Sequence, residues 1–172
     1  MAEAPQRPRA PCSVKEWGLV AAAVALLLDQ GSKLFLLYGL DMVHNAGQSV
    51  PLLPFLNLVM VWNPGVSFGM FAADSIEGTV FLATFSLIAV GGLGWWLWRA
   101  ERRQLAIGLG LVIGGAIGNL VDRLVYGKVA DFFQFYVMGY HWYVFNVADT
   151  AITFGVIALL YDALARSDAK AG

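Results

Sequence analysis

Residues 78–98 read GTVFLATFSLIAVGGLGWWLW, a run that contains no charged side chain. A helix of about 20 apolar residues crosses the ~30 Å hydrocarbon core of a bilayer, so this run predicts a membrane span. Three further apolar runs are long enough to span, although polar residues interrupt them: residues 17–38, 105–126 and 145–165. We therefore expect an integral membrane protein with four transmembrane helices.

The composition supports the same class of protein. Of the 172 residues, 59% are apolar and 13% are charged, and the mean hydropathy is +0.66. Soluble domains are nearer one quarter charged. The net charge of −1 predicts no nucleic-acid partner. The one cysteine, Cys12, excludes an internal disulfide and a cysteine-based zinc site.

The basic residues predict the orientation of the spans. Eight of the eleven flank the runs on one side, and the positive-inside rule assigns that side to the cytoplasm: Arg7, Arg9, Lys15, Arg99, Arg102, Arg103, Arg166 and Lys170. Both termini are then cytoplasmic, with a flexible leader (1–16), one transmembrane domain (17–165) and a tail (166–172). A cleavable signal peptide is the alternative for the first run, but no convincing small-residue cleavage site follows its apolar core.

The segments expected outside the cytoplasm are residues 39–77 and 127–144. Within the first, Val50–Trp62 is rich in valine and leucine and is broken by prolines, which predicts one or two short strands. Residues 66–73 predict a short interfacial helix that presents Phe68, Met70 and Phe71 to lipid. The expected fold is thus all-α in the membrane, with a small β element outside it.

Polar residues interrupt three of the four runs at a common depth. At 1.5 Å per residue, Asp29 lies ~18 Å beyond Trp17 and Asp122 lies ~26 Å beyond Leu105, so both fall in the outer half of the bilayer. Ionisable groups inside a membrane indicate a functional site that faces the protein interior. Hydrogen bonds that only hold the helices together are the alternative. The residues expected at this level are Asp29, Lys33, Asn119, Asp122, Arg123, Lys128, Asp131, Asn146 and Asp149.

Spacing predicts several local contacts. Asp29 and Lys33 are four residues apart on one helical face and can pair. Asn146 is a candidate N-cap for the fourth helix, with Asp149 in its first turn. Glycines at every fourth position form a ridge that would let another helix approach closely: Gly110, Gly114 and Gly118.

The side-chain inventory narrows the chemistry. Ser32 and Lys33 are adjacent and do not face each other on a helix, which argues against a Ser–Lys dyad. His44 and His141 form no metal-ligand pattern, so we expect surface or interfacial roles for them. Carboxylates remain, and Asp131 and Asp149 have the least local charge compensation. Two carboxylates in a poorly solvated site share a proton, so one can activate water while the other polarises a carbonyl.

Five short motifs occur in order along the chain: Asp29-Gln-Gly-Ser-Lys33, Asn63-Pro-Gly65-Val-Ser-Phe68, Gly114-Gly-Ala-Ile-Gly118-Asn119-Leu-Val-Asp122-Arg123, Val129-Ala-Asp131-Phe132 and Phe145-Asn146-Val-Ala-Asp149. Together they resemble the lipoprotein signal peptidase (signal peptidase II) family of bacterial inner membranes. The resemblance covers residues 17–165. It implies a metal-free aspartic peptidase, without cofactor, that has four transmembrane helices, a small extracytoplasmic β-cradle and an interfacial helix.

The same resemblance assigns roles to individual residues. It implies a catalytic pair, Asp131 and Asp149, and a set of supporting or substrate-binding residues: Asp29, Lys33, Asn63, Gly65, Asn119, Asp122, Arg123 and Asn146. The implied substrate is a prolipoprotein whose cysteine carries diacylglycerol, cut just before that cysteine at the periplasmic side. The implied inhibitors are cyclic peptides of the globomycin type. We expect the protein to contact membrane lipid and to be a monomer.

Two other functions fit part of the pattern. A small transporter or an ion or proton channel could use the intramembrane charges, but the second run has no polar face and the charges crowd one leaflet. A non-enzymatic membrane scaffold fits the glycine ridge, but it gives Asp131 no role.

Overall fold

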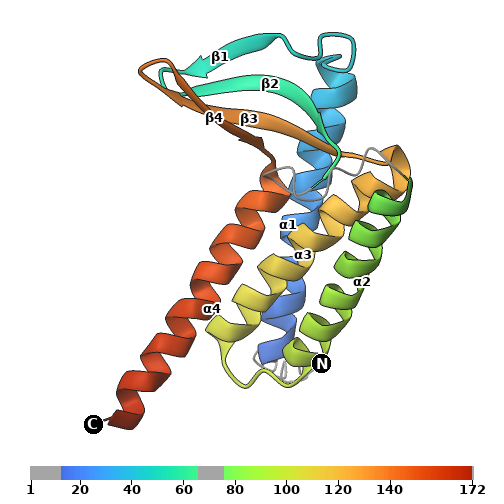
Figure 1. The fold of residues 1–172 in the computed structure, drawn as a ribbon. Coiled ribbons are helices and arrows are strands. Elements are labelled where there is room, and N and C mark those ends of the chain that lie inside the picture. The colour runs from blue at the N-terminus through green and yellow to red at the C-terminus, as the bar shows by residue number, and fades with distance from the viewer. Residues whose placement is uncertain (1–12, 66–75, 172) are drawn as a thin grey trace, which may run out of the picture.

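The computed structural model of this chain describes residues 13–65 and 76–171. Within them, four long helices stand side by side (Figure 1): α1 (Val14–Leu34), α2 (Ile76–Trp98), α3 (Arg103–Tyr126) and α4 (Val147–Ala171). Each contains a segment long and apolar enough to cross a membrane. The prediction of four apolar helices is therefore confirmed.

The helix ends differ from the predicted ones by a few residues. Helix α1 begins at Val14, because Ser13 and Glu16 form a reciprocal capping box. It continues as a π-helical turn, η1 (Phe35–Gly39). Helix α4 begins at Val147, since Phe145 belongs to a strand and Asn146 caps the helix. Residues 1–12 of the expected leader lie outside the described residues.

A four-stranded antiparallel sheet lies across one end of the bundle (Figure 1). Its strands, paired in the order β1-β2-β3-β4, are β1 (Ser49–Leu53), β2 (Leu56–Asn63), β3 (Val129–Val137) and β4 (Tyr140–Phe145). The first two confirm the strands expected within 50–62, with Pro51 on the edge strand, where a missing N–H is tolerated. The sheet corrects the all-α description, which holds for the helical bundle alone. The expected interfacial helix at 66–73 lies outside the described residues.

The β3–β4 hairpin was not predicted from the sequence. Its two-residue loop, Met138 and Gly139, has positive φ angles of 50° and 84°. Such a loop matches the twist of an antiparallel hairpin, but asparagine or aspartate usually occupies the first position. Methionine there gave no turn signal, so residues 127–144 were expected only as an outer loop.

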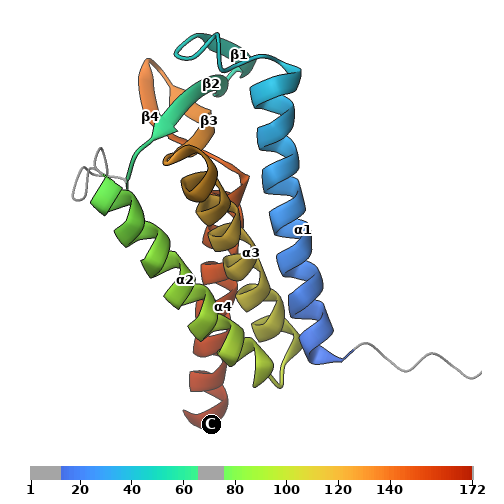
Figure 2. The same cartoon turned by 90° about the vertical axis from the view of Figure 1, so that its right-hand side faces the viewer.

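Helix α3 is the centre of the bundle and packs against each of the other three helices (Figure 2). In the most apolar stretch of α3, 56% of the residues are buried inside the protein. In the corresponding stretch of α2 only 11% are buried, so most of the α2 surface is available to contact lipid. The glycine ridge explains the close approach of α1, which confirms that prediction. A Cβ atom at Gly110 or Gly114 would meet a backbone carbonyl of α1, and one at Gly118 would fall on the carboxylate of Asp29.

A small apolar core joins the sheet to the bundle. Leu36 and Leu37 of η1 pack with buried residues on the inner face of the central strands: Leu58, Met60, Ala130 and Phe132. This packing holds β3 against the end of the bundle where α4 begins. As a result Asp131 on β3 and Asp149 on α4 belong to one layer, beneath the sheet.

Candidate active site

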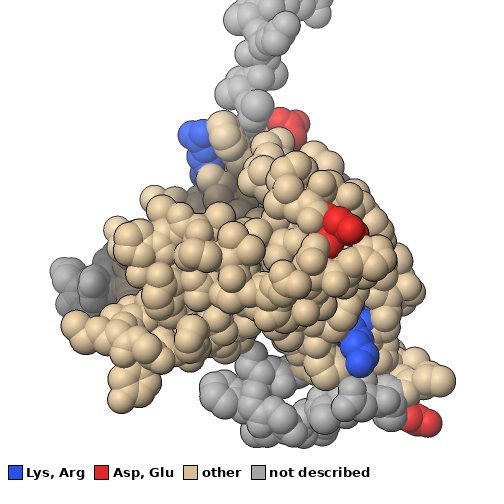
Figure 3. All heavy atoms as spheres, turned by 90° about the horizontal axis from the view of Figure 1, so that it is seen from above, with Lys and Arg blue, Asp and Glu red and all other residues tan. Residues whose placement is uncertain are grey.

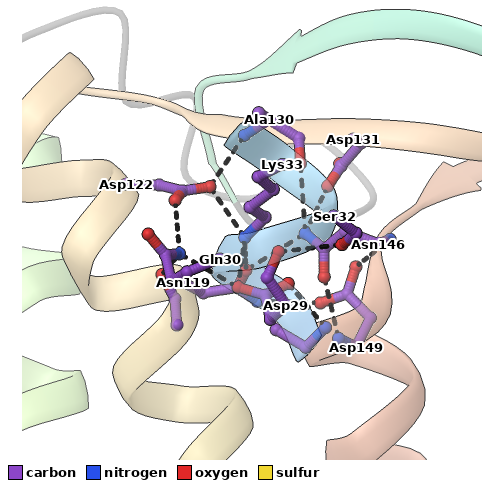
Figure 4. A network of polar contacts seen from close by, with 12 residues as sticks. Asp29, Gln30, Ser32, Lys33, Asn119, Asp122, Ala130, Asp131, Asn146 and Asp149 are labelled. Atoms are coloured by element: carbon purple, nitrogen blue, oxygen red, sulfur yellow. Dashed lines mark hydrogen bonds and ion pairs between the residues drawn. The ribbon is translucent and has the colours of Figure 1, made fainter. Parts of the chain in front are cut away.

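The polar residues of α1, α3, β3 and α4 converge in one hydrogen-bonded network under the sheet (Figure 4). Their convergence at one depth was predicted from helix geometry, and the contacts confirm it. The residues that the network brings together are Asp29, Gln30, Lys33, Asn63, Asn119, Asp122, Asp131, Asn146 and Asp149.

Lys33 forms the centre of the network. Its Nζ lies 2.8 Å from Asp29 Oδ2 and 2.8 Å from Asp122 Oδ2, and all three side chains are almost fully buried. The pairing of Asp29 with Lys33 was expected from their spacing. The pairing of Asp122 with Lys33 across the α1–α3 contact was not predicted, because the two residues lie on different helices.

The two ion-paired carboxylates each bind a backbone amide in another element. Asp29 Oδ1 accepts a hydrogen bond from the N–H of Ala148 at 2.9 Å. Asp122 Oδ2 accepts one from the N–H of Ala130 at 3.1 Å. These alanines directly precede Asp149 and Asp131. Through its two ion pairs, Lys33 therefore positions Asp29 and Asp122. These two carboxylates in turn hold the backbone amides that precede the other two carboxylates of the site.

Asp131 accepts hydrogen bonds from two asparagine amides. Asn63 Nδ2 donates to Oδ2 at 2.9 Å, and Asn146 Nδ2 donates to Oδ1 at 2.7 Å. The orientation of Asn63 is fixed from its other side, because its Oδ1 accepts from the N–H of Gly65 at 3.0 Å. Gly65 thus acts on Asp131 through Asn63.

Asp149 is held by a reciprocal cap at the start of α4. Its N–H donates to Asn146 Oδ1 at 2.9 Å, and its Oδ2 accepts from the N–H of Asn146 at 3.3 Å, which confirms Asn146 as the N-cap. Asn119 Nδ2 donates to Asp149 Oδ1 at 2.9 Å. The Oδ1 of Asn119 accepts from both Lys33 and Asn146, so its amide can point only one way.

The carboxylates of the site thus fall into two kinds. Asp29 and Asp122 both form ion pairs with the one charge of Lys33. Asp131 and Asp149 accept from the neutral amides of Asn63, Asn119 and Asn146. A carboxylate bonded to neutral donors in a buried site takes up a proton more readily than one paired with a cation.

Burial and the negative charge of Asp149 raise the pKa of Asp131 to about 7, although the amides of Asn63 and Asn146 oppose the shift. Asp131 is 2% exposed, which accounts for the size of the desolvation effect. Burial also raises the pKa of the Tyr143 hydroxyl, with the charges of Asp149 and Asp131 acting in the same direction. Tyr143 therefore stays protonated at neutral pH.

Two adjoining cavities reach the carboxylates. Asp131 lines a cavity of about 690 Å³ together with Trp62, Asn63 and residues of β4. Asp149 lines a second of about 310 Å³, whose other walls are mostly aromatic and include Phe154 of α4. Trp142 and Tyr143 line both cavities and form the boundary between them. Sequence reasoning missed these two residues, because β4 was not predicted as a strand.

Gln30 is a second contributor that sequence reasoning missed. Its Nε2 lies 3.1 Å from Asp29 Oδ2, from Asp122 Oδ1 and from the carbonyl of Gly118. Its place inside the Asp29–Lys33 motif was the available signal. Arg123, expected as a supporting residue, donates to the Asn119 carbonyl at 3.1 Å and attracts Asp149 electrostatically.

The other candidate chemistries find no support in the geometry. The Ser32 hydroxyl donates to the Asp29 carbonyl at 2.8 Å, while Lys33 is engaged with Asp29 and Asn119. His44 contacts Asp41 on the surface, and His141 lies exposed on β4 at the rim of the larger cavity. Within residues 13–65 and 76–165, no three His, Cys, Asp or Glu side chains are grouped so that they could hold a metal ion.

Comparison with known sequences decides the family. The model of the family described as signal peptidase (SPase) II matches residues 21–165. This chain belongs to the signal peptidase II family. Two lipoprotein signal peptidases illustrate the similarity: one from Nitrobacter hamburgensis is 49% identical over 156 residues, and one from Rhodopseudomonas palustris (strain TIE-1) is 47% identical over 151. The alignments cover 88% and 86% of this chain and 94% and 91% of those proteins.

Two solved structures described as bacterial membrane enzymes share the fold. One superposes with a TM-score of 0.77 at 25% identity, over 89% of this chain and 90% of that one. The other has a TM-score of 0.72 at 27% identity, over 86% and 92%. Membership of the signal peptidase II family makes the chain a peptidase, and it favours that function over the transporter or channel.

Proposed function

We propose that this signal peptidase II removes the signal peptide from prolipoproteins, with Asp131 and Asp149 as its catalytic pair. The observation that carries the assignment is the division of carboxylates described above. Asp29 and Asp122 are both ion-paired with Lys33, whereas Asp131 and Asp149 accept from neutral amides and line adjoining cavities. These two are the carboxylates that can share a proton next to a substrate.

In the proposed reaction the two carboxylates take different parts. Asp131 carries the shared proton, because it is the more deeply buried of the two and its pKa is raised to about 7. It donates a hydrogen bond to the carbonyl oxygen of the scissile bond. Asp149, partly exposed in the smaller cavity, takes a proton from a water molecule as that water attacks the carbonyl carbon. As the tetrahedral intermediate collapses, its C–N bond breaks and the proton that Asp149 took from water passes to the leaving amine nitrogen, which restores the Asp149 carboxylate.

The surroundings of the pair suit a lipid-bearing substrate. The smaller cavity combines Asp149 with an aromatic wall and reaches Phe154, which is 61% exposed on the side of α4 that would face lipid. We infer that the substrate is a prolipoprotein whose cysteine carries diacylglycerol. The bond cut lies just N-terminal to that cysteine, so the acyl chains stay in the membrane while the amide reaches the carboxylates.

The proposed location is the bacterial inner membrane, with both termini in the cytoplasm and the catalytic pair near the periplasmic leaflet. In support, α1 begins and α4 ends at the side of the bundle opposite the sheet (Figure 1). Basic residues gather on that side, as the positive-inside rule requires of a cytoplasmic face. On the opposite side the described residues of the sheet present few charged side chains (Figure 3), which suits contact with the membrane surface.

The test of the function uses the purified full chain in detergent. A prolipoprotein carrying diacylglycerol is expected to lose its signal peptide, and mass spectrometry of the product should find the modified cysteine at its N-terminus. The matched substrate with serine in place of that cysteine should remain uncut. Equal cleavage of both substrates would refute the proposed specificity, and ion flux in proteoliposomes without cleavage would refute the function.

Two further expectations belong to the same assay. A globomycin-type cyclic peptide should abolish cleavage by occupying the cavities at Asp131 and Asp149, and a metal chelator should leave the rate unchanged. We expect a monomer to suffice, because both carboxylates and all their amide donors come from one chain. Activity found only in a dimer fraction after size exclusion would contradict this.

A further inference from the structure

The end of the bundle opposite the sheet carries three cations stacked on tryptophan rings, and they join three helices. The contacts, given as the distance from the cation to the ring centroid, are Lys15 Nζ to Trp98 at 4.3 Å, Arg99 Cζ to Trp95 at 4.1 Å and Arg103 Cζ to Trp17 at 3.4 Å. We call Lys15, Arg99 and Arg103 the stacked cations. Their arrangement takes no part in the site under the sheet.

The stacked cations keep their hydrogen-bond donors free. Among the residues that the structure describes, none of the three forms an ion pair or a side-chain hydrogen bond. Arg102, at the same end, is instead bound by the buried carboxylate of Asp162 at 2.8 Å. A guanidinium that lies flat on a ring still presents its N–H groups along its edge, in the geometry that pairs with phosphate oxygens.

Among the side chains that the structure describes, the carboxylates at this end compete only weakly for the stacked cations. Asp162 is taken by Arg102, and the side chain of Glu16 accepts from the N–H of Ser13 in the capping box. Glu101 is exposed in the turn between α2 and α3. After these pairings the positive charge of the stacked cations exceeds the negative charge beside them.

The tryptophan rings place this charge at the level of lipid headgroups. Trp95 and Trp98 are 61% and 65% exposed although each contacts a cation, so their outer faces are open to the surroundings of the bundle. Indole rings with one wet and one apolar side are typical of the membrane interface. The phosphate groups of the bilayer lie at this depth. A lipid can also contact the exposed rings with its apolar part, whereas inorganic phosphate has no apolar part to do so.

We propose that the stacked cations bind the phosphate of an anionic phospholipid, such as phosphatidylglycerol, at the end of the bundle opposite the sheet. The lipid phosphate accepts from the guanidinium edges of Arg99 and Arg103, and Lys15 adds a third positive charge. The acyl chains of the lipid lie against the exposed tryptophan rings. The proposal stands independently of the peptidase activity.

The test is native mass spectrometry of the full chain in detergent, titrated with phosphatidylglycerol or with phosphatidylcholine of the same acyl chains. We expect tighter retention of phosphatidylglycerol, weakened about fivefold for each stacked cation replaced by glutamine. The variants are R99Q, R103Q and the double variant R99Q/R103Q. E101Q is the matched control at the same end and should retain the lipid. Prolipoprotein cleavage by every variant should match the unmodified protein, which shows that each is folded.

Three results would overturn the proposal. Unchanged retention of phosphatidylglycerol by R99Q/R103Q would show that the stacked cations do not bind this lipid. Equal retention of phosphatidylglycerol and phosphatidylcholine would show that the net charge of the lipid does not determine binding. Displacement of phosphatidylglycerol by equimolar inorganic phosphate would show a site for soluble phosphate in place of one for lipid.

Discussion

Replacing Lys33 with methionine tests whether one buried cation positions both catalytic aspartates. At 2.8 Å and an effective dielectric constant of about 20, each of its two ion pairs corresponds to ~6 kcal/mol of Coulomb attraction. The desolvation of three buried ions offsets most of this. Removing one member of a buried ion pair costs about 3–5 kcal/mol, because the partner charge is left uncompensated. We expect Lys33→Met to lower stability by about that amount.

The effect should be visible as a change in melting temperature. For a domain of this size 1 kcal/mol corresponds to about 2–4 °C, so Tm in detergent should fall by about 6–20 °C. Cleavage should fall as well, because Asp29 and Asp122 hold the amides of residues 148 and 130 next to the catalytic pair.

Two further variants sharpen this prediction. Lys15→Met, the same substitution in the same helix, removes a cation that stacks on Trp98 and should cost no more than about 1 kcal/mol. Adding Asp122→Asn to Lys33→Met restores the net charge of the cluster and should recover part of the stability. If Lys33→Met melts within 2 °C of the unmodified protein, the positioning argument is wrong.

The remaining predictions address the glycine ridge, the shared proton and an amide donor. Gly118→Ala places a methyl group on the Asp29 carboxylate and should cost about 1–3 kcal/mol and most of the cleavage rate, whereas Gly92→Ala, which has open space, should change neither. Because folding raises the pKa of Asp131 to about 7, its contribution to stability is present below pH 4 and is lost as the pH rises to 7. Chemical denaturation should therefore show Asp131→Asn gaining up to about 4 kcal/mol relative to the unmodified protein between pH 4 and pH 7, and no change with pH would contradict the shift. For the same reason the cleavage rate should decline above pH 7, and a rate that rises steadily to pH 9 would exclude Asp131 as the proton carrier. Asn119→Ala should lower kcat more than it changes KM, since the lost donor contacts Asp149 and not the substrate.

Contacts within one helix could be predicted from the sequence, because helical spacing alone sets them. The four apolar runs gave the helices, the four-residue spacing gave the Asp29–Lys33 pair, and the Asn-x-x-Asp spacing gave the cap at Asn146. Depth along each helix also placed the polar residues in one layer, since rise per residue is constant.

The glycine ridge predicted that another helix packs closely on α3, but the individual residue pairs between elements could not be predicted, because they depend on how helices and strands meet. The pairing of Lys33 with Asp122 requires the register of α1 against α3, which glycines set by close packing. The aromatic boundary at Trp142 and Tyr143 requires the β3–β4 hairpin, whose Met-Gly loop carries no common turn signal. The resemblance to a family supplied Asn63 and Gly65, which spacing alone did not connect to Asp131.

The central claim is that Asp131 and Asp149 together activate water. The most direct test is cleavage of a diacylglyceryl-modified prolipoprotein by Asp131→Asn, Asp149→Asn and the double variant, each checked for folding by its melting temperature. Asp41→Asn, an exposed carboxylate near the sheet, serves as the control. The account predicts that each single variant loses cleavage, that the double variant is no worse than either, and that the control is unaffected. Cleavage at the normal rate by either folded single variant would contradict it.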